Sequence, residues 1–490
     1  MNKKILGTFS KISSANLINI IVGILKIKFL SVTLGTEGMG VLGQLLNINN
    51  FIIFLTTFGI PLGIVKYISE WESQDKYEEI YSLLKKIFLF SLFISVFISI
   101  SIIIFAPYIS ILSFGSGKFK ILIVFLAISF PFTVLTSLLE SYLRGLKRYN
   151  EFVKVTIINT IVSSAVFVLF PLYLGVEGLE FSFLVSAIIC TLIYLFFLLK
   201  WKIISLKRLL SKVTVNVNSP FWDILKLGFA SLIIGCLSQI SLLVIRRSII
   251  EDFGLSVNGL YQSVLSVSNN YISFIYMALG VYYLPLFSQI ADEDKLNLEI
   301  NSGVKFVVCF VFPIIASSFV FRNLLIRLFF NSQFDLAEQF YFFNFLGDFF
   351  RAIALMLALW QIPKLKTKSW ILLESFYNLN LVFFYFLIIY LFNAGAKSAS
   401  AGYLAANIIH CFLNFEYLRR SNHFKFTKKN KFVVSVSIIS IVLLFGISSY
   451  DYFWGMLLIA PVITIWGLLV VSKDDYLQIV SIVRTRFFNN

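Results

Sequence analysis

Residues 87–110 read IFLFSLFISVFISISIIIFAPYIS, a stretch without a single charged side chain. A helix rises 1.5 Å per residue, so about 20 apolar residues span the hydrocarbon layer of a membrane. Similar stretches recur along all 490 residues, of which 59% are hydrophobic and 13% are charged. A soluble protein of this length could not bury so much apolar surface, because single cores stop growing well below this size. The sequence therefore predicts an all-α polytopic membrane protein.

Polar residues, glycines and prolines divide the chain into fourteen predicted spans. They cover residues 12–34, 40–65, 87–110, 119–143, 153–174, 178–199, 224–250, 259–287, 304–329, 336–361, 369–392, 398–418, 432–449 and 453–471. The first span follows Lys3, Lys4 and Lys11, as the apolar part of a signal peptide would, but it runs to about Leu34 without a small-x-small cleavage pattern. We therefore expect a retained first helix.

The 41 lysines and arginines predict the orientation. Connections that follow odd-numbered spans, such as Gly35–Met39 and Glu251–Asn258, are short and nearly devoid of cations, whereas Lys200–Lys212 and Arg419–Lys431, which follow even-numbered spans, are basic. The positive-inside rule then predicts a multi-pass membrane protein with both termini in the cytoplasm. This topological pattern accounts for most of the net charge of +16, so nucleic acid is not expected as a partner.

The sequence does not predict an enzyme. The connections on the predicted outer side are too short to build a catalytic domain, and no glycine-rich loop with Lys and Ser/Thr is present to hold a nucleotide. The four cysteines lie far apart inside apolar stretches, and the two histidines, His410 and His423, have no cluster of metal-binding residues around them in the sequence. We therefore expect no metal and no cofactor.

An internal repeat appears when the chain is compared with itself at an offset of about 219 residues. The offset aligns Lys28 with Arg247, Gly35 with Gly254, Gly40 with Gly259, Lys86 with Lys305 and, one residue further on, Asn49-Asn50 with Asn269-Asn270. Both copies start on the same side, so the repeat is parallel, as in transporters that bind substrate between two lobes and alternate access. We predict two pseudo-symmetric six-helix lobes, at 1–212 and 213–425, and two further helices with a cytoplasmic tail at 426–490.

Charged residues inside the predicted spans point to the chemistry of the substrate. They are seven cations, Lys26, Lys28, Arg246, Arg247, Arg322, Arg327 and Arg351, and one acid near mid-span, Asp348. Asp348 and Arg351 are three residues apart on one helical face, where they could pair as a structural ion pair or as a coupling site. An uncompensated charge in the bilayer costs roughly 2.5–3.5 kcal/mol on insertion scales. A hydrated cavity that binds an anion through charge-assisted hydrogen bonds would relieve this cost.

The predicted substrate site contains Lys26, Lys28, Arg246, Arg247 and Arg322, with Asn50 and Asn270 for the hydroxyl groups of a sugar. The alternative for the cations is that they extend to the membrane interface or bind carbonyl groups at helix ends. For the asparagines, the alternative is hydrogen bonding between helices.

Several short stretches resemble the Wzx-type polysaccharide flippases of the multidrug/oligosaccharidyl-lipid/polysaccharide exporter (MOP) superfamily. They are KFLSVTLG at 28–35, GIVKY at 63–67, GLYQS at 259–263, YLPLFS at 283–288, NSQF at 331–334 and LGD at 346–348. The resemblance implies a MATE-like fold whose cationic cavity moves an undecaprenyl-diphosphate-linked oligosaccharide, such as an O-antigen unit, to the outer leaflet. In that family Lys28 and Asp348 match a first-helix lysine and a tenth-helix aspartate. Fourteen spans instead of twelve resemble the lipid II flippases more closely.

Three hypotheses follow. The first is the flippase, with the lipid-linked glycan and membrane lipids as partners and with the polysaccharide polymerase and chain-length machinery left open as further partners. The second is a cation-coupled exporter of small molecules on the same fold, which would be expected to carry acids rather than cations in its lobes. The third is a scaffold for glycan assembly, which would leave the cations within the spans unexplained.

Overall fold

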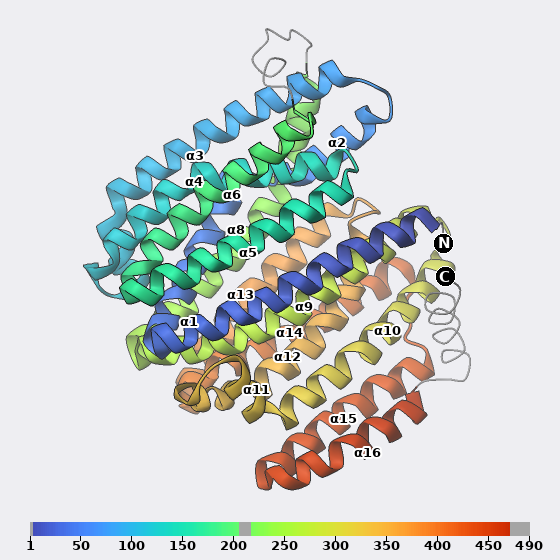
Figure 1. The fold of residues 1–490 in the computed structure, drawn as a ribbon. Helices are drawn as coiled ribbons and strands as arrows, with labels where there is room; N and C mark the ends of the chain where they lie inside the picture. The colour runs from blue at the N-terminus through green and yellow to red at the C-terminus, as the bar shows by residue number, and fades with distance from the viewer. Residues whose placement is uncertain (1–2, 205–216, 471–490) are drawn as a thin grey trace. The chain divides into compact units, whose positions relative to one another are not determined.

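The computed structural model describes residues 3–204 and 217–470, and within these ranges the chain is helical with no β-strand (Figure 1). The helices are α1 (Lys3–Thr57), α2 (Ile60–Glu72), α3 (Tyr77–Phe114), α4 (Lys120–Gly145), α5 (Tyr149–Leu174), α6 (Gly178–Lys200), α8 (Asn218–Phe253), α9 (Leu255–Gln289), α10 (Glu293–Val320), α11 (Arg322–Phe329), α12 (Glu338–Ala358), α13 (Thr367–Phe392), α14 (Ser398–Asn422), α15 (Lys428–Tyr450) and α16 (Tyr452–Val470). Short 3-10 turns lie at Gly117–Phe119, Gly175–Glu177, Ser332–Ala337, Leu359–Gln361 and Gly395–Lys397. The predicted all-α class is confirmed.

The predicted spans coincide with helices throughout, although their division differs. In the described residues, eleven stretches are long and apolar enough to cross a membrane. Two of them, Ile18–Thr57 and Tyr149–Lys200, each cover most of two predicted spans, because the chain turns at Gly35 and at Gly175–Glu177 without an intervening loop. The helix α14 is not among the eleven, since its buried face carries Tyr403, Asn407, His410 and Asn414.

The chain forms two compact units, which are described separately. Unit 1 contains the described residues up to Ser263 together with Leu328–Phe334, and unit 2 contains Val264–Arg327 and the described residues from Asp335 onward. The lobes at 1–212 and 213–425 and the extension at 426–490 remain a prediction. In this structure α8 packs within unit 1, against α1, α2 and α3.

Unit 1 shows how an apolar sequence packs when its outer face meets lipid. In α3, the buried positions include Ser91, Ser95 and Ser99, spaced one helical turn apart, whereas Phe93 and Phe97 are exposed. Small buried residues let neighbouring helices approach closely, and large apolar side chains are stable where they face hydrocarbon. Along this part of α3 the buried side is thus the more polar one, the reverse of a soluble helix.

Unit 2 is built around α12, which packs against α10 and α14, and α13 packs on α14. The two C-terminal helices also belong to it. α15 contacts α10 through hydrogen bonds from Asn430 Nδ2 to the main-chain carbonyl of Asn301 (2.7 Å), and α16 contacts α15 through Trp466 Nε1, which donates to Ser437 Oγ (2.8 Å). These buried polar contacts attach the pair α15–α16 to α10.

Candidate functional site

The kinks that follow the first helix of each repeat have similar backbone conformations. Gly35 has φ 63° and ψ −168°, and its repeat partner Gly254 has φ 89° and ψ 168°. These angles are readily available only to glycine, because a Cβ atom would clash with the backbone. The agreement of two unusual conformations about 219 residues apart supports the internal repeat.

The repeat partners Gly40 and Gly259 meet each other where α1 crosses α9 in unit 1. A Cβ atom built on Gly40 would lie 3.1 Å from the main-chain nitrogen of Gly259, and one on Gly259 would lie 3.0 Å from that of Gly40. Asn258 Nδ2 donates a hydrogen bond to the Gly40 carbonyl over 2.8 Å. Two glycines therefore bring the backbones of equivalent helices into direct contact.

Arg246 lies beside this crossing with only 2% of its surface exposed. Its guanidinium donates hydrogen bonds to Asn258 Oδ1 (3.0 Å) and to Gln262 Oε1, and it lies 5.7 Å from the centre of the Tyr261 ring. Gly43 makes the space, since a Cβ atom there would lie 2.7 Å from Gln262 Oε1. We call Arg246, Asn258 and Gln262 the amide cradle.

Within the described residues, the hydrogen-bond partners of Arg246 are neutral, and its Nε atom has none. A buried charge is costly unless it is paired or fully hydrogen-bonded, and amide oxygens offset only part of that cost. The cradle thus holds a positive charge that no acid neutralises, next to the contact between the two repeats.

Lys26 and Lys28 lie on α1 before its kink at Gly35, and both are partly buried. The ammonium of Lys26 lies 5.3 Å from the centre of the Phe167 ring. Lys28 Nζ donates to the main-chain carbonyl of Phe330, in the short segment Leu328–Phe334 that belongs to unit 1. Asn331 Nδ2 in the same segment donates to the Ser31 carbonyl (3.3 Å). The segment therefore follows α1 close to the kink at Gly35.

Arg247 differs from Arg246, although the two are adjacent. Its guanidinium forms an ion pair with Glu251 one helical turn later, and it lies against Gly115 at the end of α3. Glu251 was expected in a connection, but α8 continues to Phe253 and brings this acid onto the helical face of Arg247. The sequence analysis did not predict this ion pair, because it ended the helix at residue 250 and so placed Glu251 outside it.

Arg322 also has an acidic partner. It lies at the start of α11 in unit 2, and its Nε atom donates to Glu338 Oε1 at 2.5 Å. Its terminal nitrogens donate to the Phe319 carbonyl (3.1 Å) and to the hydroxyl (2.9 Å) and carbonyl (3.1 Å) of Ser448. The side chain is 5% exposed and connects α11 with α12 and α15.

Asp348 and Arg351 lie in unit 2, but their expected pairing runs through a third residue. The carboxylate of Asp348 accepts hydrogen bonds from Ser268 Oγ (2.6 Å), from the Tyr271 hydroxyl and from the Tyr403 hydroxyl (2.7 Å). Arg351 donates to the same Tyr403 hydroxyl over 3.1 Å. Tyr403 thus bridges the two residues, because its hydroxyl group accepts a hydrogen bond from Arg351 and donates one to Asp348.

The two candidate asparagines lie in different units, Asn50 exposed in unit 1 and Asn270 partly exposed in unit 2.

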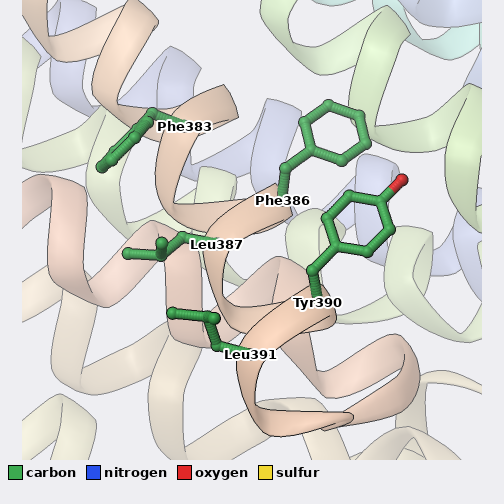
Figure 2. A pocket seen from close by; sticks show the side chains of 5 residues that line it. All are labelled: Phe383, Phe386, Leu387, Tyr390 and Leu391. Atoms are coloured by element: carbon green, nitrogen blue, oxygen red, sulfur yellow. The ribbon is translucent and has the colours of Figure 1, made fainter.

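A further feature of unit 2 is a hollow of about 330 Å³ on the surface of α13, lined by Phe383, Phe386, Leu387, Tyr390 and Leu391 (Figure 2). Figure 2 shows all five side chains projecting from this single helix, with the rings of Phe386 and Tyr390 on the same side. Its lining is almost wholly apolar, so it cannot hold the charged part of an anionic substrate.

Several site residues were beyond the reach of sequence analysis. The sequence predicts Asn258 in a connection and Gln262 inside the span that follows it. Their spacing of four residues on a helix that starts at Leu255 puts both amides on one face. Glu374 and His410, 36 positions apart, become neighbours only because α13 and α14 pack together, with 3.6 Å between Oε1 and Nε2.

Comparison with known proteins gives relatives along most of the chain. The lipid III flippases of Escherichia coli (strain K12) and of Shigella flexneri are each 23% identical over 406 residues, which cover 81% of this chain and 94% of the relative.

Two classes of solved structure share the fold. An inward-facing multidrug resistance MATE family transporter of the MOP superfamily has a TM-score of 0.71 at 16% identity, covering 83% of this chain and 94% of its own. The lipid II flippase MurJ in an inward closed conformation has a TM-score of 0.68 at 17% identity, covering 94% of this chain and 98% of its own.

The model of the polysaccharide biosynthesis protein family matches residues 30–338, well over half of the chain. This match, the lipid III flippase relatives and the MurJ- and MATE-like fold confirm the resemblance to MOP-superfamily flippases. The chain is a multi-pass membrane protein that belongs to the polysaccharide biosynthesis protein family.

Proposed function

We propose that this protein is a flippase that translocates an undecaprenyl-diphosphate-linked oligosaccharide, an O-antigen unit or a related surface-polysaccharide unit, from the inner to the outer leaflet by alternating access. Family membership and the similarity to lipid III flippases support this assignment. In this proposal the membrane is the bacterial cytoplasmic membrane and both termini are cytoplasmic, as the distribution of Lys and Arg favours. The polymerase and the chain-length machinery would receive the product on the outer side.

The observation that carries the proposal is the amide cradle of unit 1. Arg246 presents forked N–H donors, and among the residues that the structure describes its Nε atom has no partner and no acid neutralises its charge. A guanidinium matches the oxygen atoms of a phosphate in charge and in geometry. Lys26, which contacts an aromatic ring, would add positive charge from α1. A diphosphate supplies the anion that these side chains lack.

Alternating access makes the cradle reachable. Arg246 is buried where α1 crosses α9, at the contact of Gly40 with Gly259. Separation of the two helices would expose the guanidinium to a substrate, and their return would bury it again. The cradle would thus bind the anion in one state only. A ligand shifts a conformational equilibrium only when its affinity differs between the two states, and this arrangement would provide such a difference. Arg247 and Arg322, which have acidic partners, would contribute less to binding than Arg246.

A second candidate is a flippase for a lipid II-type peptidoglycan precursor. The match to MurJ covers 94% of the chain, compared with 83% for the MATE transporter. A coupled exporter of cationic drugs on the same fold is less well supported, because the cradle is cationic.

The test uses a strain that lacks this protein. We expect an undecaprenyl-diphosphate-linked glycan to accumulate there, detected by mass spectrometry, and wild-type protein to remove it. Arg246→Gln should restore less than a tenth of the surface glycan at an equal protein level in the membrane, and Arg246→Lys should restore part of it. The matched control is Arg327→Gln, a cation of α11 whose side chain is 71% exposed, which should restore all of it.

Accumulation of a lipid II-type precursor would favour the second candidate. Absence of any lipid-linked intermediate would contradict both flippase proposals. Full restoration of surface glycan by Arg246→Gln would refute the role of the cradle.

A further inference from the structure

A second polar region, in unit 2, has no part in the function proposed above. It follows the buried face of α14, where Tyr403, Asn407, His410 and Asn414 recur every three or four residues. The neighbouring helix α13 contributes Glu374 and Tyr377 to the same region. A helix in a membrane does not bury so many polar side chains without a reason, and ionisable ones are most often functional.

Its centre is the pair of Glu374 and His410. The Glu374 Oε1 atom lies 3.6 Å from His410 Nε2, and the imidazole ring packs on the Tyr377 ring with 4.8 Å between the ring centres. The His410 side chain is 7% exposed, and its buried Nε2 atom has no hydrogen bond. Glu374 remains 23% exposed. A small approach would turn the pair into a charge-assisted hydrogen bond.

We infer that Glu374 and His410 form a proton-binding site, in which the carboxylate and the imidazole ring together take up one proton. Without this proton the pair carries one negative charge, and with it the pair is neutral. The proton comes from water, reaches the pair at the more exposed carboxylate and returns to water, so no other group changes its charge.

The surrounding charges require one proton. Arg351 from α12 and Tyr377 from α13 act directly on the pair. The ionisable groups next to these two residues are Tyr403 from α14, Tyr276 from α9 and Asp348 from α12, and Asp348 is in turn bound by Tyr271 from α9. Arg351 acts electrostatically on both Glu374 and His410, and it is connected through Tyr403 to Asp348. Two carboxylates and one guanidinium leave one negative charge in a membrane interior, and one bound proton removes it.

The ligand chemistry favours a proton over a metal ion. Hard cations such as Na⁺ or Mg²⁺ prefer several oxygen ligands, whereas this site offers one carboxylate, one ring nitrogen and a nearby guanidinium that repels cations. Within the described ranges, no three acidic, histidine or cysteine side chains come together as a metal site would need.

A row of hydrogen-bonded polar side chains extends from the pair to the N-terminal end of α13. Asn414 donates to the carbonyl of His410 (2.9 Å) and accepts from Gln361 Nε2 (3.2 Å). Gln361 Oε1 in turn accepts from the hydroxyl of Ser369 (3.0 Å), in the first turn of α13. This end of the helix follows the basic connection Lys364–Lys368, which the sequence places in the cytoplasm.

The chain offers a direct test because it has only two histidines, His410 and the exposed His423. Purified protein labelled with ¹⁵N-histidine gives two sets of imidazole NMR signals, and His423→Gln assigns them. We expect the signals of the His410 ring to change between pH 5 and 9, as the pair takes up its proton. The midpoint of this change should fall by about one pH unit or more in Glu374→Gln, because the carboxylate that takes part in binding the proton is lost. Glu374→Asp should keep most of the titration, and the His423 signal reports whether each variant is folded.

A His410 signal that stays constant from pH 5 to 9, or a midpoint that Glu374→Gln leaves unchanged in folded protein, would overturn the inference. Addition of NaCl in place of acid should not reproduce the signal change, and if it does, the site binds sodium rather than a proton. The titration uses no substrate, so its outcome is independent of whether the flippase proposal holds.

Discussion

The two copies of the repeat have nearly the same backbone around their kinks, yet they differ in what they bury. In the second copy, Arg246, Asn258 and Gln262 form the amide cradle, whereas the equivalent positions of the first copy carry Ile27, Met39 and Gly43. Gly43 and Gln262 are equivalent by the repeat, and they face each other in space. The comparison teaches that two copies with similar backbones can differ in charge. The second copy contributes the cation Arg246, and the first copy contributes Gly43, whose missing side chain leaves space for it.

The largest effect is expected at the crossing of the two copies. Gly259→Ala places a Cβ atom against the main chain of α1, close to Thr36 and Gly40, so the helices must separate. We expect a loss of about 3 kcal/mol of stability, typical of severe overpacking, measured as a lower Tm in detergent. Gly40→Ala should behave alike. The control Gly23→Ala, also on α1, has no atom within 4 Å of its new methyl group and should melt like the wild type. Equal melting of Gly259→Ala and Gly23→Ala would show that the helices do not touch there.

A smaller effect is expected from the cradle that only the second copy has. Asn258→Ala removes the amide that accepts from Arg246 and donates to the Gly40 carbonyl. Leaving a buried charged donor and a carbonyl unsatisfied should cost about 2 kcal/mol. The exposed Asn50→Ala serves as the control and should stay within about 0.5 kcal/mol of the wild type. If both asparagine variants unfold at the same denaturant concentration, Asn258 does not hold Arg246 in place.

The smallest effect tests the symmetry of the kinks themselves. Gly35→Ala and Gly254→Ala force an alanine into a conformation with positive φ, which should cost about 1–2 kcal/mol at each site. Both variants should lower the Tm by similar amounts, because the backbone angles of the two sites nearly agree. A marked difference between them would mean that only one kink persists in the working protein.

Much of the fold follows from the sequence, because the bilayer imposes a simple rule. Lipid offers no hydrogen bonds, so each apolar stretch becomes a helix that satisfies its own backbone. The repeat was also readable, since Gly35 and Gly254 are needed for a conformation that other residues avoid. The pairing of the cations was less predictable. Arg247 pairs with Glu251 and Arg322 with Glu338, and both acids lie near helix ends. Sequence analysis locates such ends only to within a few residues.

By itself, the sequence determined the helical class, the places where the chain turns and the excess of positive charge inside the spans, because these depend on local hydropathy and on glycine. Only the tertiary structure decided which charges are neutralised. Arg246 meets amides rather than an acid, Tyr403 bridges Arg351 and Asp348, and His410 meets Glu374. Each of these contacts joins residues on different helices or beyond a predicted helix end, and the packing of the helices, which no local pattern encodes, brings them together.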